Sequence, residues 1–355
     1  MTGDHLDDLR TTLRTLLAAH APLARVRTTA LAGKPRDEGV WNRLVAEVGV
    51  AGLPFAEVDG GAGGGQRELV VLLEETGAVL LDQPLFSTVA LAGQLVAETV
   101  SGPARTQLLP LLAGGAARST VAVGDDGEPL TELELADGRL TGTVLRVPEA
   151  ARSTEVLVVL AGGCVVRVDL DQPGVTLRPT DALDPTRPCA DVVFDGAAAE
   201  VLAENATDGL ARWRRLAVLA NGAEQAGVCR AALTMAVEYA KLRVQFDKPI
   251  GAQQAIQHLL AGVLAGTVGA EAAVRLAAAA VDEGRSDAAE LVAVAAAHAA
   301  ETAVSATKAL IQVHGGIGFT WEHDAHLLYR RALASAAFFG GAAARRRELA
   351  TVLQI

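Results

Sequence analysis

One segment of the chain carries residue types suited to holding a phosphate-bearing ligand. Residues 239–258 read YAKLRVQFDKPIGAQQAIQH and include Arg243, Phe246, Gln253 and Gln254. A guanidinium group forms paired hydrogen bonds with phosphate oxygens, so Arg243 is a candidate phosphate ligand. Taken alone, Arg243 is better explained as a surface arginine at a helix end.

A second segment offers a backbone that a ligand could approach closely. Residues 312–324 read QVHGGIGFTWEHD, in which Gln312 is followed by Gly315 and Gly316. Glycines suit such an approach because a Cβ would obstruct it. The alternative for Gly315 and Gly316 is a simple connector between helices.

Two other motifs lack the partners that their chemistry needs. The glycine run at 60–65 is not followed by Lys-Ser/Thr and has no strand-to-helix context, so it predicts a flexible connector rather than a phosphate loop. His323 and His326 have metal-ligand spacing, but no carboxylate-His-His set accompanies them. We expect a solvated helix start there and predict no metal site.

Composition narrows the class of protein. The chain has 355 residues, enough for substantial cores in two or three domains. Hydrophobic residues make up 50% and charged residues 21%, which is typical of a globular protein. The formal charge of −11 argues against nonspecific binding to nucleic acid or to anionic lipid.

The sequence also predicts a cytoplasmic location. The three cysteines, Cys164, Cys189 and Cys229, form no CxxC pair and no zinc array. The N-terminus is polar and amphipathic, without a signal-peptide core. Apolar runs such as 259–270 and 332–344 are too short to span a bilayer, so we expect no membrane partner.

Hydrophobic periodicity divides the chain into three regions. Residues 1–118 are mainly helical; Leu6, Leu9, Leu13, Leu16 and Leu17 form one apolar stripe. Residues 119–203 alternate in short segments separated by glycine turns, which predicts a compact, antiparallel β domain. We expect strands over 130–135, 139–144, 156–160, 165–170 and 192–194.

Residues 204–355 return to helical periodicity. We expect helices over 209–242, 252–282, 287–312 and 324–353, with Asp287 capping the third of them. Four long helices at the end of the chain predict a four-helix bundle. The predicted fold is therefore α+β, mainly α, in the order helices, β domain, helical bundle.

The two opening segments and this domain order resemble the acyl-CoA dehydrogenase family, in particular its short actinobacterial members. The likeness also covers WNRLVAEVGVAGLPFAEVDGGAGGG and LVVLLEETGAVLLDQPLFST near the N-terminus. It implies an oxidoreductase of fatty acid or lipid metabolism that acts on CH–CH bonds. The implied cofactor is FAD, the substrate an acyl thioester, and the partners an electron acceptor and further subunits.

The resemblance assigns roles to the candidate residues. Arg243 and Phe246 match the family's Arg-x-x-Phe, whose arginine meets the FAD pyrophosphate of a neighbouring subunit. Gln312, Gly315 and Gly316 match Gln-x-x-Gly-Gly, whose backbone approaches the ADP half. Gln254 matches a recurrent glutamine, and Gln253 lies beside it in the adjoining turn. Asp247 replaces the usual glycine and adds a negative charge near the pyrophosphate position.

The family's catalytic glutamate has no counterpart at either of its known positions. Counting from the glycine turn places Phe339 there, and neither Phe339 nor its neighbour Gly340 can take a proton. The alternative position, on the first helix of the bundle, falls at Ala217. Glu224 lies seven residues later on the same helix face and is the candidate base, although a structural carboxylate is the favoured alternative.

The flavin-ring elements also depart from the family pattern. The Thr-Glu-Pro-Gly-x-Gly loop is represented by residues 123–127, VGDDG, and Trp-Ile-Thr by residues 146–149, RVPE.

Three functions are compatible with these residues. The first is an acyl-CoA or acyl-carrier-protein dehydrogenase, preferably the base-lacking subunit of a heteromer. The others are a noncatalytic scaffold and a flavin oxidase or monooxygenase.

Overall fold

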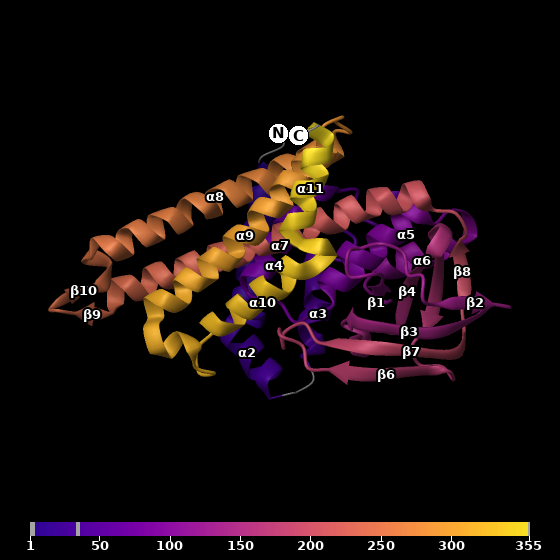
Figure 1. Cartoon of the computed structure of the whole chain (residues 1–355), viewed down its shortest axis with the longest axis horizontal. Helices are drawn as coiled ribbons and strands as arrows, with labels where there is room; N and C mark the ends of the chain where they lie inside the picture. Colours follow the sequence, from indigo (N-terminus) through magenta and orange to yellow (C-terminus); the bar gives the residue numbers. More distant parts are fainter. Residues whose placement is uncertain (1–3, 33–35, 354–355) are drawn as a thin grey trace. The chain divides into compact units, whose positions relative to one another are not determined.

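The structure, a computed structural model, describes residues 4–32 and 36–353. Helices occupy both ends of the sequence and strands the middle, which confirms the predicted fold class (Figure 1). The α-helices are α1 (Asp4–His20), α2 (Leu23–Leu31), α3 (Glu38–Arg43), α4 (Gln66–Ala78), α5 (Gln94–Thr99), α6 (Gly102–Ala113), α7 (Thr207–Leu242), α8 (Gln254–Asp282), α9 (Ala288–His314), α10 (Ala325–Ala337) and α11 (Gly341–Leu353).

The chain forms two compact units. The first comprises residues 1–35, 70–81 and 218–355, so it combines the N-terminal helices with the C-terminal bundle. The second comprises residues 36–69 and 82–217 and contains the large sheets. The domain boundaries expected near residues 118 and 203 follow sequence order rather than this division and stay a prediction.

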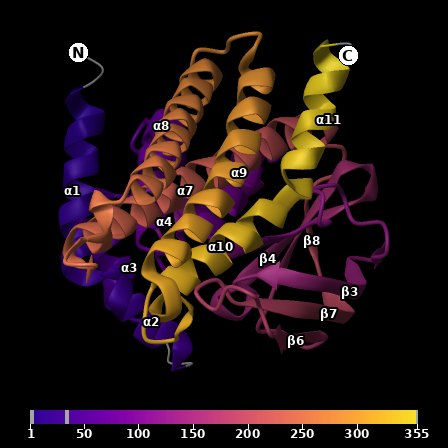
Figure 2. The same ribbon diagram turned by 60° about the vertical axis from the view of Figure 1, so that its left-hand side comes forward.

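The helical bundle of the first unit is built from α7, α8, α9 and α10 (Figure 2). The single helix expected over 324–353 is instead two helices, α10 and α11, separated by a 3-10 turn at Phe338–Gly340. Phe339, Gly340 and Gly341 have φ values of 53°, 81° and 64°, a left-handed run that a continuous helix cannot include.

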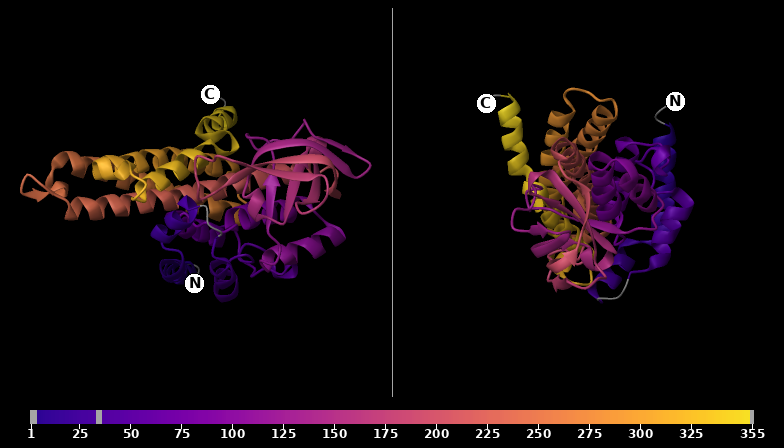
Figure 3. Two further views of the ribbon diagram at one scale, coloured as in Figure 1. Left: turned by 90° about the horizontal axis from the view of Figure 1, so that it is seen from below. Right: turned by 90° about the vertical axis from the view of Figure 1, so that its right-hand side faces the viewer.

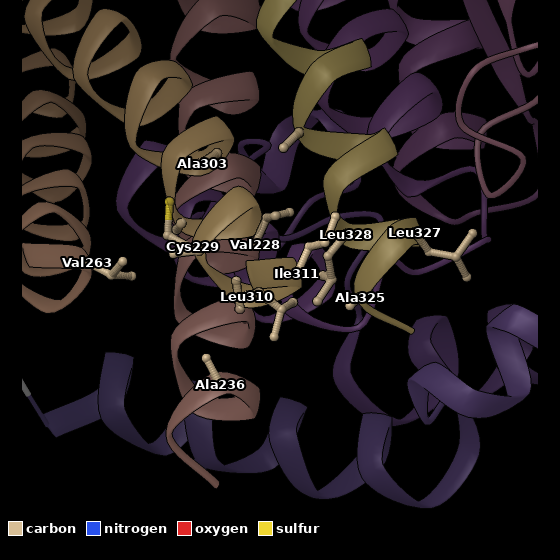
Figure 4. Packing of buried hydrophobic residues seen from close by; sticks show 14 of the residues in the cluster. Val228, Cys229, Ala236, Val263, Ala303, Leu310, Ile311, Ala325, Leu327 and Leu328 are labelled. Atoms are coloured by element: carbon tan, nitrogen blue, oxygen red, sulfur yellow. The ribbon is translucent and has the colours of Figure 1, made fainter. Parts of the chain in front are cut away.

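Alanine dominates the core of this bundle. Ala232, Ala236 and Ala240 of α7 and Ala303 and Ala306 of α9 are buried in one cluster. Their small side chains allow close helix approach, while larger side chains fill the remaining space at the density of a protein interior. Figure 4 shows Leu310 and Ile311 of α9 and Leu328 of α10 within the same cluster.

Helices α4 and α7 approach each other closely enough to require glycine. A Cβ built on Gly227 would lie 2.0 Å from the Glu74 carbonyl oxygen, and one on Gly77 would lie 2.4 Å from that of Glu224. Both distances are far below van der Waals contact. Gly227 and Gly77 therefore set the separation of the two helices.

The second unit contains two four-stranded sheets. Their orders are β1-β4-β5-β8 and β2-β3-β7-β6. The strands are β1 (Ser119–Ala122), β2 (Glu134–Ala136), β3 (Arg139–Pro148), β4 (Glu155–Leu160), β5 (Cys164–Asp169), β6 (Val175–Thr180), β7 (Cys189–Ala198) and β8 (Glu200–Ala203). All pairs in these sheets are antiparallel except β1 with β4, which is parallel.

Candidate functional site

Arg243 lies at the base of a small hairpin that follows α7. Strands β9 (Val244–Gln245) and β10 (Lys248–Pro249) pair antiparallel, and Phe246 and Asp247 form the turn with φ values of 54° and 62°. The Arg243 N–H donates to the Tyr239 carbonyl, and its own carbonyl accepts from Ile250 N–H, both at 2.8 Å. The backbone is thus fixed while the side chain is exposed.

The glycine turn follows α9 directly, as a 3-10 segment at Gly315–Phe319. Gly315 has φ 64° and ψ −140°, a conformation open to glycine. A Cβ built on Gly315 or Gly316 would meet no atom of this chain's described residues within 4 Å. Both glycines are exposed, so any group that needs their bare backbone comes from outside this unit.

An aromatic stack joins the hairpin to the turn. The ring of Tyr239, one helical turn before Arg243, stacks on His314 with centroids 4.1 Å apart. His314 immediately precedes Gly315 and also contacts His323, with centroids 4.4 Å apart. Figures 1 and 3 show the hairpin and the turn toward the same end of the bundle. The structure therefore brings together the two segments that the sequence singled out.

The glutamines have different surroundings. Gln312, in the last turn of α9, and Gln254, the first residue of α8, are exposed. Gln253 is the half-buried N-cap residue of α8, but its side chain makes no capping bond. Gln312 is therefore accessible next to Gly315, and Gln254 borders the Arg243 hairpin through the short 3-10 segment at Ile250–Ala252.

Sequence reasoning singled out Phe246 but not the other two exposed aromatic side chains of this region, Phe319 and Trp321. Phe246 is 85% exposed, Phe319 72% and Trp321 55%. The Arg330 guanidinium lies over the Trp321 ring, 4.7 Å from its centroid. Exposed aromatic side chains next to a cation are typical of binding surfaces. Their clustering in two segments that also contain Arg243 and Gly315 was the available signal.

Arginines such as Arg243 supply positive charge at this site, whereas its histidines do not. Within residues 4–32 and 36–353 the Arg243 guanidinium has no hydrogen-bond or ion-pair partner. Burial lowers the pKa of His314 and of His323, and lowers that of His326 to about 4, so these rings are neutral at pH 7. In the same described ranges no cluster of His, Cys, Asp or Glu is arranged to hold a metal.

These residues fit the diphosphate half of a dinucleotide. An unpaired guanidinium, an open glycine backbone and flanking aromatic rings match the charge and the flat groups of such a ligand. The exposed Asp247 carboxylate in the hairpin turn opposes it. The site on this chain is open to solvent and does not by itself enclose a ligand.

Glu224 is engaged in a buried ion pair. The Arg331 Nη1 of α10 donates to the Glu224 Oε1 at 3.1 Å, and the two side chains are 1% and 5% exposed. On the same helix face, the Asn221 amide donates to the Ser335 carbonyl at 3.0 Å. To accept a proton, Glu224 would have to leave a buried guanidinium without its countercharge, which is costly. The geometry favours the structural role, and the assignment as a base stays a prediction.

The two positions where the resemblance places a base carry inert side chains. Phe339 is 3% exposed, and its ring meets that of Phe338 edge-on with centroids 4.5 Å apart. The buried Arg345 donates to the Phe339 carbonyl at 2.8 Å, which fixes the left-handed turn. Ala217 is fully buried. Neither Phe339 nor Ala217 can exchange a proton.

The segments that correspond to the flavin-ring elements do not fit a ring. Residues 123–127 form a turn in which Gly124 N–H donates to the Glu128 carbonyl, and Asp125 pairs with Arg146. Glu149 is 3% exposed, with φ 53°, and accepts a hydrogen bond from Ser87 at 2.6 Å. Asp125 and Arg146 of these two segments thus pair with each other, Glu149 is bound by Ser87, and neither segment contains an indole to stack on a flavin.

Comparison with known proteins places these features in a family. Profiles described as "Acyl-CoA dehydrogenase, C-terminal domain" and "Acyl-CoA dehydrogenase, N-terminal domain" match residues 211–353 and 3–116. The chain is 33% identical over 331 residues to acyl-CoA dehydrogenase IpdE2 of Mycobacterium tuberculosis, covering 92% of this chain and 91% of that protein. It is 35% identical to acyl-CoA dehydrogenase FadE34 of the same organism, covering 92% of this chain and 44% of FadE34.

Solved structures agree with this likeness. The ChsE4-ChsE5 complex from Mycobacterium tuberculosis contains a chain that matches with a TM-score of 0.89 and 28% identity, covering 100% of this chain and 98% of that one. A variant of the Tcur3481-Tcur3483 steroid ACAD matches with a TM-score of 0.89 and 29% identity, covering 100% and 99%. Both relatives are complexes of two kinds of chain by their descriptions.

Proposed function

The chain belongs to the acyl-CoA dehydrogenase family, and we propose that it is the base-lacking subunit of a heteromeric, FAD-dependent acyl-CoA dehydrogenase. The proposed reaction is α,β-dehydrogenation of an acyl thioester of CoA or of an acyl-carrier protein, in the cytoplasm, with electrons passed on to a separate acceptor. The observation that carries the proposal is the exposed surface where Arg243 lies close to the open backbone of Gly315 and Gly316, which we interpret as one half of a cofactor site.

That half is the surface around Arg243. Arg243, Phe246, Gln312 and the Gly315-Gly316 backbone would contact the diphosphate and ADP part of an FAD seated mainly in a second chain. When bound, FAD supplies a hydride acceptor. This chain's own contribution is to neutralise phosphate charge at Arg243 and to exclude water with exposed aromatic side chains such as Phe246 and Phe319.

Proton removal must come from the partner. Phe339 and Ala217 stand at the two positions where relatives carry the base, and Glu224 is held by Arg331. A heteromer resolves this absence, because the second chain can provide a complete set of reacting groups. The two-chain descriptions of the ChsE4-ChsE5 and Tcur3481-Tcur3483 structures support the same arrangement.

Helix α8 offers a surface for such a partner. Leu264, Val268 and Leu276 are 51%, 55% and 47% exposed, an apolar set at helical spacing. By length and composition α8 is a candidate membrane span, although only by a test that core helices of soluble proteins also pass. We propose that a second acyl-CoA dehydrogenase-like chain, rather than lipid, covers this face.

The test is reconstitution with a glutamate-bearing family member encoded beside this chain. The purified chain alone should be colourless, and the mixture should show flavin absorbance and oxidise an acyl thioester with an artificial electron acceptor. If the chain alone is yellow and oxidises acyl-CoA, the half-site account is wrong. If no mixture binds flavin, the dehydrogenase role itself fails.

The second candidate is a noncatalytic subunit on the same fold. It is favoured by one observation, the mutual engagement of Glu149 with Ser87 and of Asp125 with Arg146 where flavin-ring contacts are expected. A scaffold would assemble with the partner without changing its flavin content. Flavin that appears only in the mixture excludes it.

A further inference from the structure

A cleft of about 540 Å³ lies between α1, the start of α2, α4 and α7, all within the first unit. Figure 2 shows α1, α2, α4 and α7. Its apolar lining includes Leu17, Leu23, Ala231 and Met235. It shares no lining residue with the Arg243 surface. A volume of this size suits a small-molecule ligand.

One end of the cleft is built on a pair of buried carboxylates. Glu74 and Glu75 of α4 are 0% and 3% exposed, and arginines from three other helices converge on them. The arginines are Arg10 and Arg14 of α1, Arg230 of α7 and Arg275 of α8, at N–O distances of 2.7 to 2.9 Å. Glu271 of α8 also joins the network through Arg230 and Arg275.

This network leaves one guanidinium with spare hydrogen-bond donors. Four arginines meet three glutamates, so the network carries a surplus positive charge. Arg14 lines the cleft, is 53% exposed and uses its Nε to donate to the Glu75 Oε2 at 2.9 Å. Its Nη groups have no partner among residues 4–32 and 36–353. They are available to an anion at this end of the cleft.

The other end of the cleft carries the opposite charge. Glu238, an exposed residue of α7, also lines it, eight residues beyond Arg230 on the same helix. Eight residues of α-helix span about 12 Å, so the anionic end stands well separated from the cationic one. Ala231 and Met235 lie on the helix surface between them. The cleft is therefore cationic, then apolar, then anionic along its length.

We propose that this cleft binds an aliphatic monocarboxylate, with the carboxylate at Arg14 and the chain along Leu23, Ala231 and Met235. A second carboxylate at the far end of the ligand would meet Glu238 and be repelled, so the site discriminates against dicarboxylates of similar length. This ligand class goes beyond the proposed dehydrogenation. Free acids of this kind are what hydrolysis of acyl thioesters releases.

The chain carries a natural reporter for this site. Met235 is one of two methionines in the sequence, so methyl-labelled methionine gives a signal that reports on the cleft. Titration of the full chain with octanoate should move the Met235 methyl resonance in a saturable way. Octanedioate, which has the same length and two carboxylates, should move it at least about tenfold more weakly.

Two variants test the two ends separately. Arg14→Gln should weaken octanoate binding by about tenfold or more, the loss expected for a charged hydrogen bond. Glu75 keeps Arg10 and Arg230, so the fold should survive the change. Glu238→Gln, at an exposed position, should leave octanoate binding intact and admit octanedioate. Arg285→Gln, which breaks an exposed pair with Asp287, is the matched control and should change neither.

The result that overturns the proposal is an unmoved Met235 signal up to the solubility limit of octanoate. Equal binding of octanoate and octanedioate by the unaltered chain would overturn it too, as would unchanged octanoate affinity in Arg14→Gln. Because the readout is a methyl signal in the cleft, octanoate bound elsewhere cannot imitate success. None of these outcomes depends on flavin or on a partner chain, so the dehydrogenase proposal stands or falls separately.

Discussion

At the scale of single residues, the most informative contact joins Glu224 to Arg331. A buried carboxylate serves either as a base or as half of an ion pair, and the 3.1 Å contact with Arg331 favours the second role for Glu224. The sequence placed Glu224 on the same helix face as Ala217, one of the two positions where the family's base is expected. It could not show the partner, because Arg331 lies 107 residues away and only tertiary packing brings it there.

Glu224→Ala should therefore lower the free energy of unfolding by about 3 to 5 kcal/mol, since it strands a buried guanidinium. Replacing both partners, as Glu224→Leu with Arg331→Met, should cost less than Glu224→Ala alone. Urea denaturation monitored by far-UV circular dichroism measures each value. If the double replacement costs as much as the two single losses added, the pair contributes nothing to stability and the structural role of Glu224 is contradicted.

The histidines near the glycine turn give stability a pH dependence. Burial lowers the pKa of His326 to about 4, mainly by desolvation, and its ring meets Trp321 edge-on. The unfolded chain, with an ordinary histidine pKa near 6.5, binds the proton more readily. His326 thus stabilises the fold fully above about pH 6.5 and loses that contribution as the pH falls toward 4.

His326→Leu should reduce the loss of stability between pH 6.5 and pH 4 relative to the unaltered chain. Thermal unfolding at a series of pH values measures this slope for both proteins. His5→Leu, at an exposed position of α1, is the control for replacing a histidine outside this cluster. If the unfolding temperatures of His326→Leu and of the unaltered chain fall equally between pH 6.5 and pH 4, His326 is not the source of this pH dependence.

At the scale of helices and turns, local signals predicted most of the elements. Helical periodicity located α7, α8 and α9 to within a few residues. The break between α10 and α11 was missed, although Gly340-Gly341 marks it, because the apolar periodicity continues on both sides. Asp287 was expected to cap α9, but its carboxylate binds Arg285 at 2.6 and 2.9 Å, a local competitor that a capping rule ignores.

Replacing a helical glycine by alanine should have opposite effects on stability at two positions. Gly227→Ala should destabilise the protein by about 1 to 3 kcal/mol or more, because its Cβ would lie 2.0 Å from a carbonyl oxygen of α4. Gly262→Ala in α8 is the matched control, since a Cβ there meets nothing within 4 Å, and it should stabilise by about 0.5 to 1 kcal/mol. Chemical denaturation of both variants tests the α4–α7 contact. Equal changes in the free energy of unfolding for the two variants would show that helix propensity alone, and not the α4–α7 contact, determines the effect.

At the scale of the whole molecule, the order of helical and strand periodicity along the chain predicted the fold class. It did not predict which distant segments pair with each other. Five strands were expected, whereas β1, β6 and β8 were not foreseen. The parallel pairing of β1 with β4 was also missed, because register between strands some 35 residues apart leaves no local signal. The candidate site was likewise predicted only in its local parts. The residues of two motifs were found, whereas the Tyr239–His314 stack that joins them needed coordinates.

In the proposed heteromer, the completeness of the site is likewise a property of the assembly. Arg243, Gly315 and Gly316 are exposed, and a Cβ on either glycine would meet no atom of the described residues within 4 Å, as expected if the proposed ligand is held mainly by another chain. In the proposed function this chain supplies the half of the site that contacts phosphate, and its sequence alone does not identify the chain that would complete it. The assembly is therefore where the proposed function is decided.

The most direct test of this account is flavin retention by the reconstituted pair when one charge is reversed. With a glutamate-bearing partner, Arg243→Glu should lower bound flavin by at least about tenfold, because a carboxylate replaces the phosphate ligand. Lys241→Glu makes the same charge change two residues away, in the exposed last turn of α7, and should retain flavin. Visible absorbance after gel filtration measures both. Full flavin retention by Arg243→Glu would contradict the central claim that this guanidinium holds the cofactor.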